Sequence, residues 1–229
     1  MKAGFFQNVW AVLAKDFLIE WKTKSRLNAL AFFSMATLLM FSFALGPNVD
    51  SKAAHAAAYM WLSILFASVL SLGESFRIEG ENHALEGLRL APLSLHAFFL
   101  GKTIANTLLL WLLSLLVVPL TLALYNVELV DGGGPPLVGV LLGGAAAIAA
   151  PGTFYAAIAH NARSKDILLP LLMFPVLVPA LVASVKATTL LLETDPMQNL
   201  SSWCTLLAAF CLVYWVLGTL LFPYVVEGD

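Results

Sequence analysis

The chain has 229 residues, of which 60% are hydrophobic and only 11% are charged. A typical soluble domain carries about 25% charged residues, so this chain could not cover a globular surface with well-solvated groups. The composition excludes a soluble protein and indicates an integral membrane protein with almost no domain outside the bilayer.

Residues 1–26 predict an amphipathic helix at the membrane interface. Apolar side chains recur there at helical spacing, and charged residues interrupt any run long enough to cross a bilayer. The interrupting residues are Lys15, Asp16, Glu20 and Lys22. A secretory signal needs an uncharged apolar core followed by a small-residue cleavage site. Neither feature precedes Lys15, so we expect no cleavage.

Six apolar stretches follow, and each is long enough to span a membrane. A helix of about 20 uncharged residues crosses a hydrocarbon layer of about 30 Å. Lipid offers the backbone no hydrogen-bond partners, and runs without a two-residue alternation favour helices over a barrel. The sequence therefore predicts an all-α polytopic membrane protein with one transmembrane domain over 1–229. The predicted spans are 27–46, 54–73, 103–125, 136–159, 167–186 and 203–226.

Basic residues are distributed unevenly between the two sides of this predicted bundle. With six spans the loops alternate, so the N-terminus, residues 74–102, residues 160–166 and the C-terminus share one side. That side holds ten of the twelve Lys and Arg residues, and only Lys52 and Lys186 lie on the other. By the positive-inside rule, both termini are expected to be cytoplasmic.

The longest hydrophilic stretch runs from Glu74 to about His96, on the predicted cytoplasmic side. It permits two interpretations: a connector resting on lipid headgroups, or a coupling element that binds a cytoplasmic protein. Its four glutamates favour the second, because the inner leaflet is anionic and would repel them. Within the stretch, residues 84–90 are expected to form a short amphipathic helix that Pro92 closes.

The fourth and fifth predicted spans contain unusual residues. Small side chains at Gly139, Gly143 and Ala147 predict close packing against another helix. The fifth span contains three prolines, which predict a kinked, irregular helix because each removes a backbone donor. They are Pro170, Pro175 and Pro179. The freed carbonyls need partners, so we expect this segment inside the bundle or along a solvated path, either as a moving element or as a fixed, bent helix.

Patterns for catalysis are missing from the sequence. No Asp, Glu, Lys or Arg lies at the centre of a predicted span, which disfavours proton coupling, and there is no HExxH pair, carboxylate cluster or serine with a base.

Gly101, Lys102 and Thr103 match the end of a phosphate-binding loop, but His96 replaces its first glycine. We interpret Lys102 as the cytoplasmic anchor of the third span. We expect a chain without catalytic residues, whose ATP, if used, is bound by a separate subunit.

The histidines and cysteines are also expected to have no catalytic role. The four histidines show no metal-ligand spacing, so no metal site is predicted. His55 alone lies near an outer helix end, where an axial haem ligand is the alternative to an ordinary interfacial histidine. Cys204 and Cys211 lie about 10 Å apart along one predicted helix, too far for a disulfide. We expect both to be packing residues.

Two segments resemble the haem-exporter permease subunit of cytochrome c maturation, the CcmB family. Residues 76–102 contain a Phe-Arg-x-Glu pattern, then Leu-Glu-x-Leu-x-Leu-x-Pro, then a lysine at the start of the third span. Residues 161–184 resemble that family's basic loop and proline-rich fifth span. His83 and Ala84 depart from the glycine and small polar residue that many members have before Leu-Glu.

This resemblance implies an ABC transporter permease of the bacterial cytoplasmic membrane. The implied activity is haem export, or ATP-driven release of a haem-loaded chaperone at the outer face. The implied partners are an ATPase subunit dimer, a haem-handling membrane subunit, a small membrane subunit and a periplasmic haem chaperone. Haem is then a possible cargo rather than a bound cofactor, and ATP acts through the partner. Carried over, the ATPase-docking loop comprises Arg77, Glu79, Leu85, Glu86, Leu88, Arg89 and Pro92, with Arg163 and Asp166 as a second contact.

Two alternatives remain open at the level of sequence. The first is an ABC permease that moves another cargo, such as a lipid, drug or polysaccharide. The second is a membrane assembly scaffold that transports nothing. The net charge of −2 says little about partners, because the two sides of the predicted bundle have opposite character, and nucleic-acid binding has no support.

Overall fold

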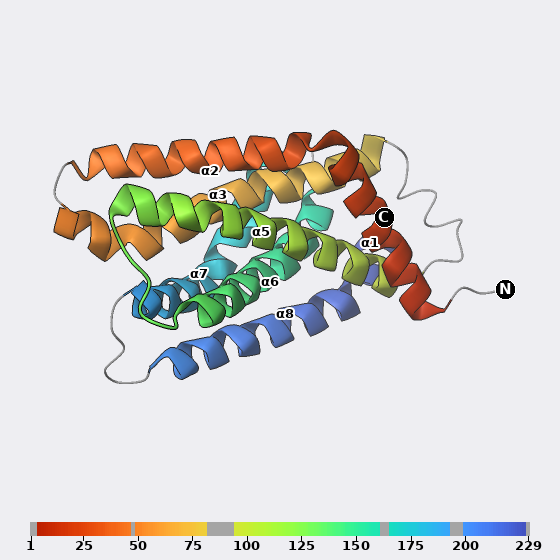
Figure 1. Cartoon of the computed structure of the whole chain (residues 1–229). Helices are drawn as coiled ribbons and strands as arrows, with labels where there is room; N and C mark the ends of the chain where they lie inside the picture. The colour runs from red at the N-terminus through yellow and green to blue at the C-terminus, as the bar shows by residue number, and fades with distance from the viewer. Residues whose placement is uncertain (1–3, 47–48, 82–93, 161–164, 193–198, 228–229) are drawn as a thin grey trace.

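The computed structural model describes residues 4–46, 49–81, 94–160, 165–192 and 199–227. Every regular element within these ranges is an α-helix, which confirms the predicted all-α fold. Six of the seven helices are long and apolar enough to cross a membrane, as predicted. Figure 1 shows these six running along the bundle, while α1 lies across one end.

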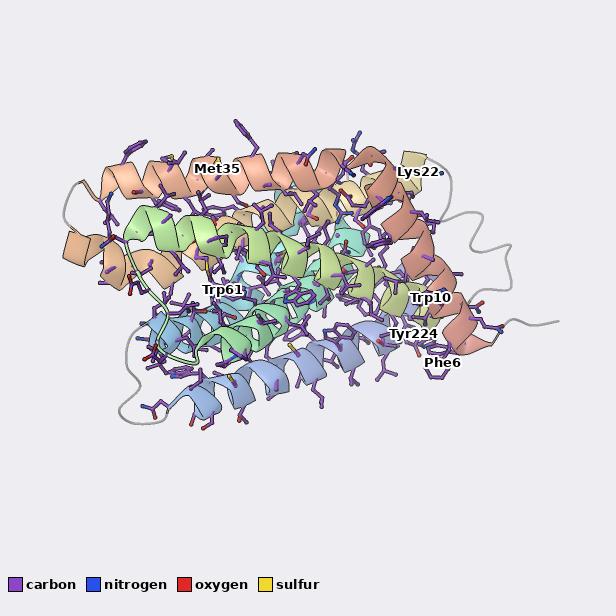
Figure 2. All side chains as sticks on the ribbon, in the orientation of Figure 1. Phe6, Trp10, Lys22, Met35, Trp61 and Tyr224 are labelled. Carbon is purple, nitrogen blue, oxygen red and sulfur yellow. The ribbon has the colours of Figure 1, made fainter. Side chains whose placement is uncertain are left out.

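Helix α1 (Phe5–Thr23) is the predicted amphipathic helix. Phe6, Trp10, Phe17 and Trp21 are exposed, whereas Asn8 and Val12 on another face are buried. Figure 2 shows Phe6 and Trp10 on this helix at the end of the bundle. Exposed aromatic side chains of this kind suit the boundary between headgroups and acyl chains.

The six long helices follow in chain order. They are α2 (Ser25–Ala44), α3 (Val49–Glu81), α5 (Leu95–Tyr125), α6 (Gly134–His160), α7 (Lys165–Leu192) and α8 (Leu200–Glu227). A single residue, Lys24, separates α1 from α2, and its left-handed backbone (φ 49°) turns the chain sharply there. The α1 helix is thus held directly on the start of the first span.

Helices α3 and α5 extend further than predicted toward the end where α1 lies. Residues 74–81 and 95–102, expected to lie in a loop, are the last and first turns of these two helices. The α5 helix begins after Ser94, whose hydroxyl accepts a hydrogen bond from the Ala97 amide at 3.2 Å. At about 1.5 Å per residue, both helices are longer than the hydrocarbon layer is thick, so they project beyond it.

Helix α6 is the centre of the bundle and packs against α3, α5, α7 and α8. Close approach depends on its glycines, because a Cβ at Gly144 would overlap the buried ring of Trp61 and one at Gly152 would overlap Leu72. Figure 2 shows Trp61 in the middle of the bundle. In lipid, apolar contact alone drives association weakly, so small residues that admit a neighbouring helix matter most.

The predicted packing residues on α6 have different surroundings. A Cβ at Gly143 would lie 3.0 Å from Leu207 of α8, and Ala147 is buried beside Ala180 and Leu207. By contrast, Gly139 is exposed and a Cβ there would meet nothing within 4 Å. Gly143 and Ala147 thus lie against neighbouring helices as expected, whereas Gly139 does not.

The α7 helix runs unbroken through its three prolines. Pro175 and Pro179 are exposed, on the side that carries exposed Leu171, Val178 and Val182. Pro170 is half-buried, and α7 packs against α3, α6 and α8, so the segment belongs to the bundle while two of its prolines lie on its outer side. A proline ring that clashes with the preceding turn is tolerated most easily where no neighbouring helix packs against the bent face.

Candidate functional site

Charged residues gather where α1 crosses the bundle, which we call the charged end. Lys15 and Asp16 come from α1, Glu79 from α3 and Lys102 from α5. The Lys102 Nζ lies 2.7 Å from Glu79 Oε1 and 3.2 Å from Asp16 Oδ2. Lys15 Nζ lies 3.3 Å from Asp16 Oδ1 and also donates to Glu79 Oε1. These four residues form one connected network, the ion cluster.

Burial makes this cluster different from a surface ion pair. The side chains of Lys102 and Glu79 are only 2% and 4% exposed, whereas that of Lys15 is 42% exposed. Lys102 also lies over the rings of Phe76 and Phe98, at 5.4 and 5.8 Å from their centroids. A charge so far from water is stable only when it is paired and hydrogen-bonded, as both are here.

The cluster favours the charged forms of Glu79 and Lys15, which lie outside the spans. Burial alone would raise the pKa of Glu79, but Lys102 and Lys15 outweigh it and hold that pKa below its usual value. Burial opposes the charge of Lys15, yet Asp16 and Glu79 raise its pKa above the usual value. At neutral pH Glu79 and Lys15 are therefore charged, and the ion cluster acts as a lock that holds α1 against α3 and α5.

A glycine permits α1 to reach this lock. At Gly101, beside Lys102, a Cβ would lie 2.8 Å from both the Val12 Cβ and the Val9 carbonyl oxygen of α1. Any side chain there would push α1 away from α5. Gly101 thus allows α1 to lie close to α5, and the neighbouring Lys102 supplies the charge that binds Asp16 of α1.

A second polar network lies beside the ion cluster and is centred on Arg26, at the start of α2. Its Nη2 donates to Ser71 Oγ at 2.6 Å and to Asn106 Oδ1 at 2.9 Å. Asn106 Nδ2 in turn donates to Thr153 Oγ1 at 3.0 Å. In this way α2, α3, α5 and α6 are joined by hydrogen bonds. Among the described residues, no carboxylate lies within ion-pair distance of Arg26.

A cavity of about 310 Å³ opens near the charged end between α3, α6 and α7. Its polar lining includes Glu74, Arg77 and His160. Arg77 and Glu74 form a two-pronged pair, with Nε to Oε2 at 2.7 Å and Nη2 to Oε1 at 2.6 Å. Since Arg77 is exposed, this pair lies at the surface of the bundle.

The predicted docking residues fall into three groups. Arg77 is exposed on α3, whereas Glu79 is buried in the ion cluster and presents no free surface. The side chain of Asp166 lies outside the described part of the structure. So do the residues of the loop itself, Leu85, Glu86, Leu88, Arg89 and Pro92, together with Arg163. ATPase docking by these residues therefore stays a prediction.

The structure also changes the interpretation of Lys102 and adds residues that sequence reasoning missed. Lys102, interpreted from the sequence as the anchor of the third span, points inward to Glu79 and Asp16. Lys15 and Asp16, which interrupt the apolar run of residues 1–26, also belong to the cluster. One signal in the sequence could have indicated this. Lys15 and Asp16 fall between the apolar positions of residues 1–26, and each has a residue of opposite charge later in the chain, Glu79 and Lys102.

Other candidates lie away from this site. His55 is exposed at the opposite end, where its ring stacks on Tyr59 with centroids 5.8 Å apart. Within the described residues, no three His, Cys, Asp or Glu side chains are grouped as metal ligands.

Cys204 and Cys211 are free thiols, and Cys211 Sγ donates to the Gly143 carbonyl at 3.3 Å. This contact supports the prediction that Cys211 is a packing residue.

Comparison with known proteins identifies the family. The model of the CcmB protein family matches residues 7–228. Heme exporter protein B of Paracoccus denitrificans is 32% identical over 161 residues, covering 69% of this chain and 72% of that protein. The protein of the same name from Rhodobacter capsulatus is 32% identical over 156 residues, covering 67% and 69%. That from Pseudomonas aeruginosa is 28% identical over 209 residues, covering 90% and 92%. Because the family model matches nearly the whole length, this chain belongs to the CcmB family.

Proposed function

We propose that this chain is the membrane permease subunit of an ABC complex that exports haem for cytochrome c maturation. The observation that carries the proposal is the family match over residues 7–228, together with relatives named heme exporter protein B. The six membrane-spanning helices are the architecture that such a subunit needs.

The proposed complex divides the work between subunits. ATP is hydrolysed by a partner ATPase dimer, and this chain supplies a membrane path or a moving element but no catalytic group. A haem-handling membrane subunit, a small membrane subunit and a periplasmic haem chaperone complete the complex. Both termini and the charged end face the cytoplasm in this proposal, in accordance with the excess of basic residues there.

The ion cluster suggests how motion would pass from the ATPase to the membrane. The proposed docking segment, residues 76–92, begins at the end of α3 and precedes α5 in the chain, and Glu79 and Lys102 tie these two helices together. Lys15 and Asp16 extend the tie to α1. A push on the loop would thus move three helices as one body rather than bend a single helix end.

Deletion of the gene in the bacterium that encodes this chain tests the function. We expect c-type cytochromes to lose covalently bound haem, as detected by haem staining of membrane proteins, and a plasmid copy to restore it. Total cellular haem should remain, because synthesis is not affected. Normal haem attachment in the deletion strain would contradict the proposal.

Charge reversal in the docking loop tests the ATPase contact. Glu86→Arg or Leu88→Asp should reduce co-purification of the ATPase at least about tenfold while the chain remains inserted in the membrane. Glu128→Arg is the matched control, since Glu128 is an exposed acidic residue in a connection at the other end of the bundle. Equal co-purification by Glu86→Arg and Glu128→Arg would remove the docking assignment.

Cysteine labelling tests the orientation. After replacement of Cys204 and Cys211, a cysteine at Ser51 should react with an impermeant thiol reagent added outside. A cysteine at Ser94, at the charged end, should react only after the membrane is opened. The reverse pattern would invert the proposed topology.

A further inference from the structure

An apolar groove of about 310 Å³ lies between α1, the start of α2 and α5. Its wall is formed mainly by large apolar side chains, and one part of its lining is charged. The apolar residues are Leu13, Phe17, Trp21, Leu27, Leu108, Leu109 and Leu112, and the charged ones are Asp16, Glu20, Lys24 and Arg26. The groove is therefore amphipathic.

The position of the groove determines which molecules can reach it. Leu108 and Leu112 are 38% and 49% exposed on the spanning part of α5, so this side faces acyl chains in a membrane. Exposed Phe17 and Trp21 of α1 mark the adjoining headgroup region. A lipid that lies along the groove would meet apolar and charged walls in the same order as its own tails and headgroup.

The charges in the lining are of both signs, and Glu20 and Asp16 attract Arg26 from beyond ion-pair distance. Lys24 and Arg26 have no carboxylate at ion-pair distance, and Glu20 has no cation at that distance, among the described residues. Lys24 Nζ lies over the Trp21 ring, 5.5 Å from its centroid. Glu20 uses one oxygen to accept from the Leu27 amide at 2.9 Å. Asp16, by contrast, is already paired in the ion cluster.

We propose that this groove binds one phosphatidylethanolamine molecule. Its phosphate pairs with Lys24 and Arg26, and its primary ammonium donates to the free oxygen of Glu20. One acyl chain lies along Leu108 and Leu112. A purely anionic headgroup would leave Glu20 without a cation and repel it, and a choline headgroup has no N–H to donate.

The size of the groove agrees with partial occupancy by a lipid. A volume near 310 Å³ is at the lower end of the range of about 300–1,000 Å³ for small-molecule sites. It holds the headgroup and the upper part of one chain, and the rest of the lipid remains in the bilayer. The bound lipid would fill the angle between α1 and α5 and so support the position of α1. The proposal does not depend on the cargo of the transporter.

Native mass spectrometry of the full-length chain, with any subunits that co-purify, tests the site. The delipidated protein is titrated separately with phosphatidylethanolamine, phosphatidylglycerol and phosphatidylcholine of identical acyl chains. We expect one phosphatidylethanolamine per chain, bound at least about tenfold more tightly than either of the others. Leu112→Trp, which fills the groove, should weaken this binding at least about tenfold.

Leu116→Trp is the matched control, since Leu116 lies one turn further along α5 with 47% exposure but does not line the groove. It should bind phosphatidylethanolamine as the parent chain does. Glu20→Gln keeps an oxygen for the Leu27 amide but removes the charge, so it should abolish the preference over phosphatidylglycerol.

Equal binding of the three lipids by the parent chain would overturn the proposal, because it would indicate only the general lipid annulus. So would equal losses in the two tryptophan variants, or an unchanged preference in Glu20→Gln. If Leu112→Trp fails to fold, the headgroup preference and its loss in Glu20→Gln still decide the question.

Discussion

The charged end and the middle of this bundle hold their helices together in different ways. At the charged end, α1, α3 and α5 are joined by the ion cluster and by hydrogen bonds from Arg26. In the middle, α6 meets α3 through shape alone, with Gly144 against Trp61 and Gly152 against Leu72. Lipid tails compete equally well for apolar surfaces, so the middle depends on close fit, whereas the charged end depends on partners for buried charge.

These two kinds of contact constrain the helices differently. A glycine contact is short-ranged and fixes the distance between two helices, so it makes the middle rigid. An ion cluster joins several helices at once and tolerates small changes in angle. The elements nearest the proposed ATPase contact are joined by charges, whereas α6 and α3 deep in the bilayer are joined by close packing.

Loss of Lys102 should have the largest effect on this comparison. Lys102→Met leaves Glu79 buried with only the half-exposed Lys15 as a cation, and breaking a buried pair in this way costs about 3–5 kcal/mol. We expect that decrease in the free energy of unfolding, measured by denaturation in mixed micelles. Lys22→Met, at an exposed position of α1, should change it by less than about 0.5 kcal/mol.

A double variant sharpens this result. Glu79→Gln combined with Lys102→Met removes both buried charges, so it should be less destabilised than the sum of the single variants. A simple sum would mean that the two side chains do not interact, and the ion cluster would lose its role as a lock.

A methyl group in the middle of the bundle should have the next largest effect. Gly144→Ala places a Cβ against the fully buried Trp61, whose Nε1 is fixed by a hydrogen bond to Thr188 Oγ1 at 2.9 Å. Overpacking of this kind costs about 1–3 kcal/mol. Gly139→Ala on the same helix meets nothing and should be neutral or slightly stabilising. Similar losses in both variants would show that the cost at Gly144 does not come from its contact with Trp61 of α3.

The sequence predicts the middle better than it predicts the charged end. Six spans could be found because charge-free runs of bilayer length are a local property of the chain. The ends of α3 and α5 could not, since charged residues such as Arg77 and Glu79 end a hydrophobic run without ending a helix. The start of α5 is marked instead by the N-cap at Ser94, which composition alone does not reveal.

The ion cluster was missed for a different reason. Lys102 is 23 residues from Glu79 and 86 from Asp16, so only the folded arrangement brings their charges together. A charge between apolar positions of a surface helix is usually solvated, so the position of Lys15 indicates burial only when Glu79 is considered as its partner. The outward direction of Pro175 and Pro179 was likewise decided by packing, because small residues on the other face of α7 fit against α6.

The pH dependence of stability should give the smallest effect and the sharpest view of the ion cluster. The folded-state pKa of Glu79 is lowered from 4.5, so its contribution is complete above that value and is lost as pH falls through the folded pKa. The pKa of Lys15 is raised from 10.5, so its contribution persists until pH rises above that value. Because Lys15 is 42% exposed, solvent screens its share. The thermal midpoint should therefore be level from about pH 6 to 9 and fall below about pH 5, with a smaller fall in Glu79→Gln. Parallel curves for the two proteins in acid would mean that other carboxylates govern the acid transition, and that α1 is held by Gly101 and its contacts rather than by charge.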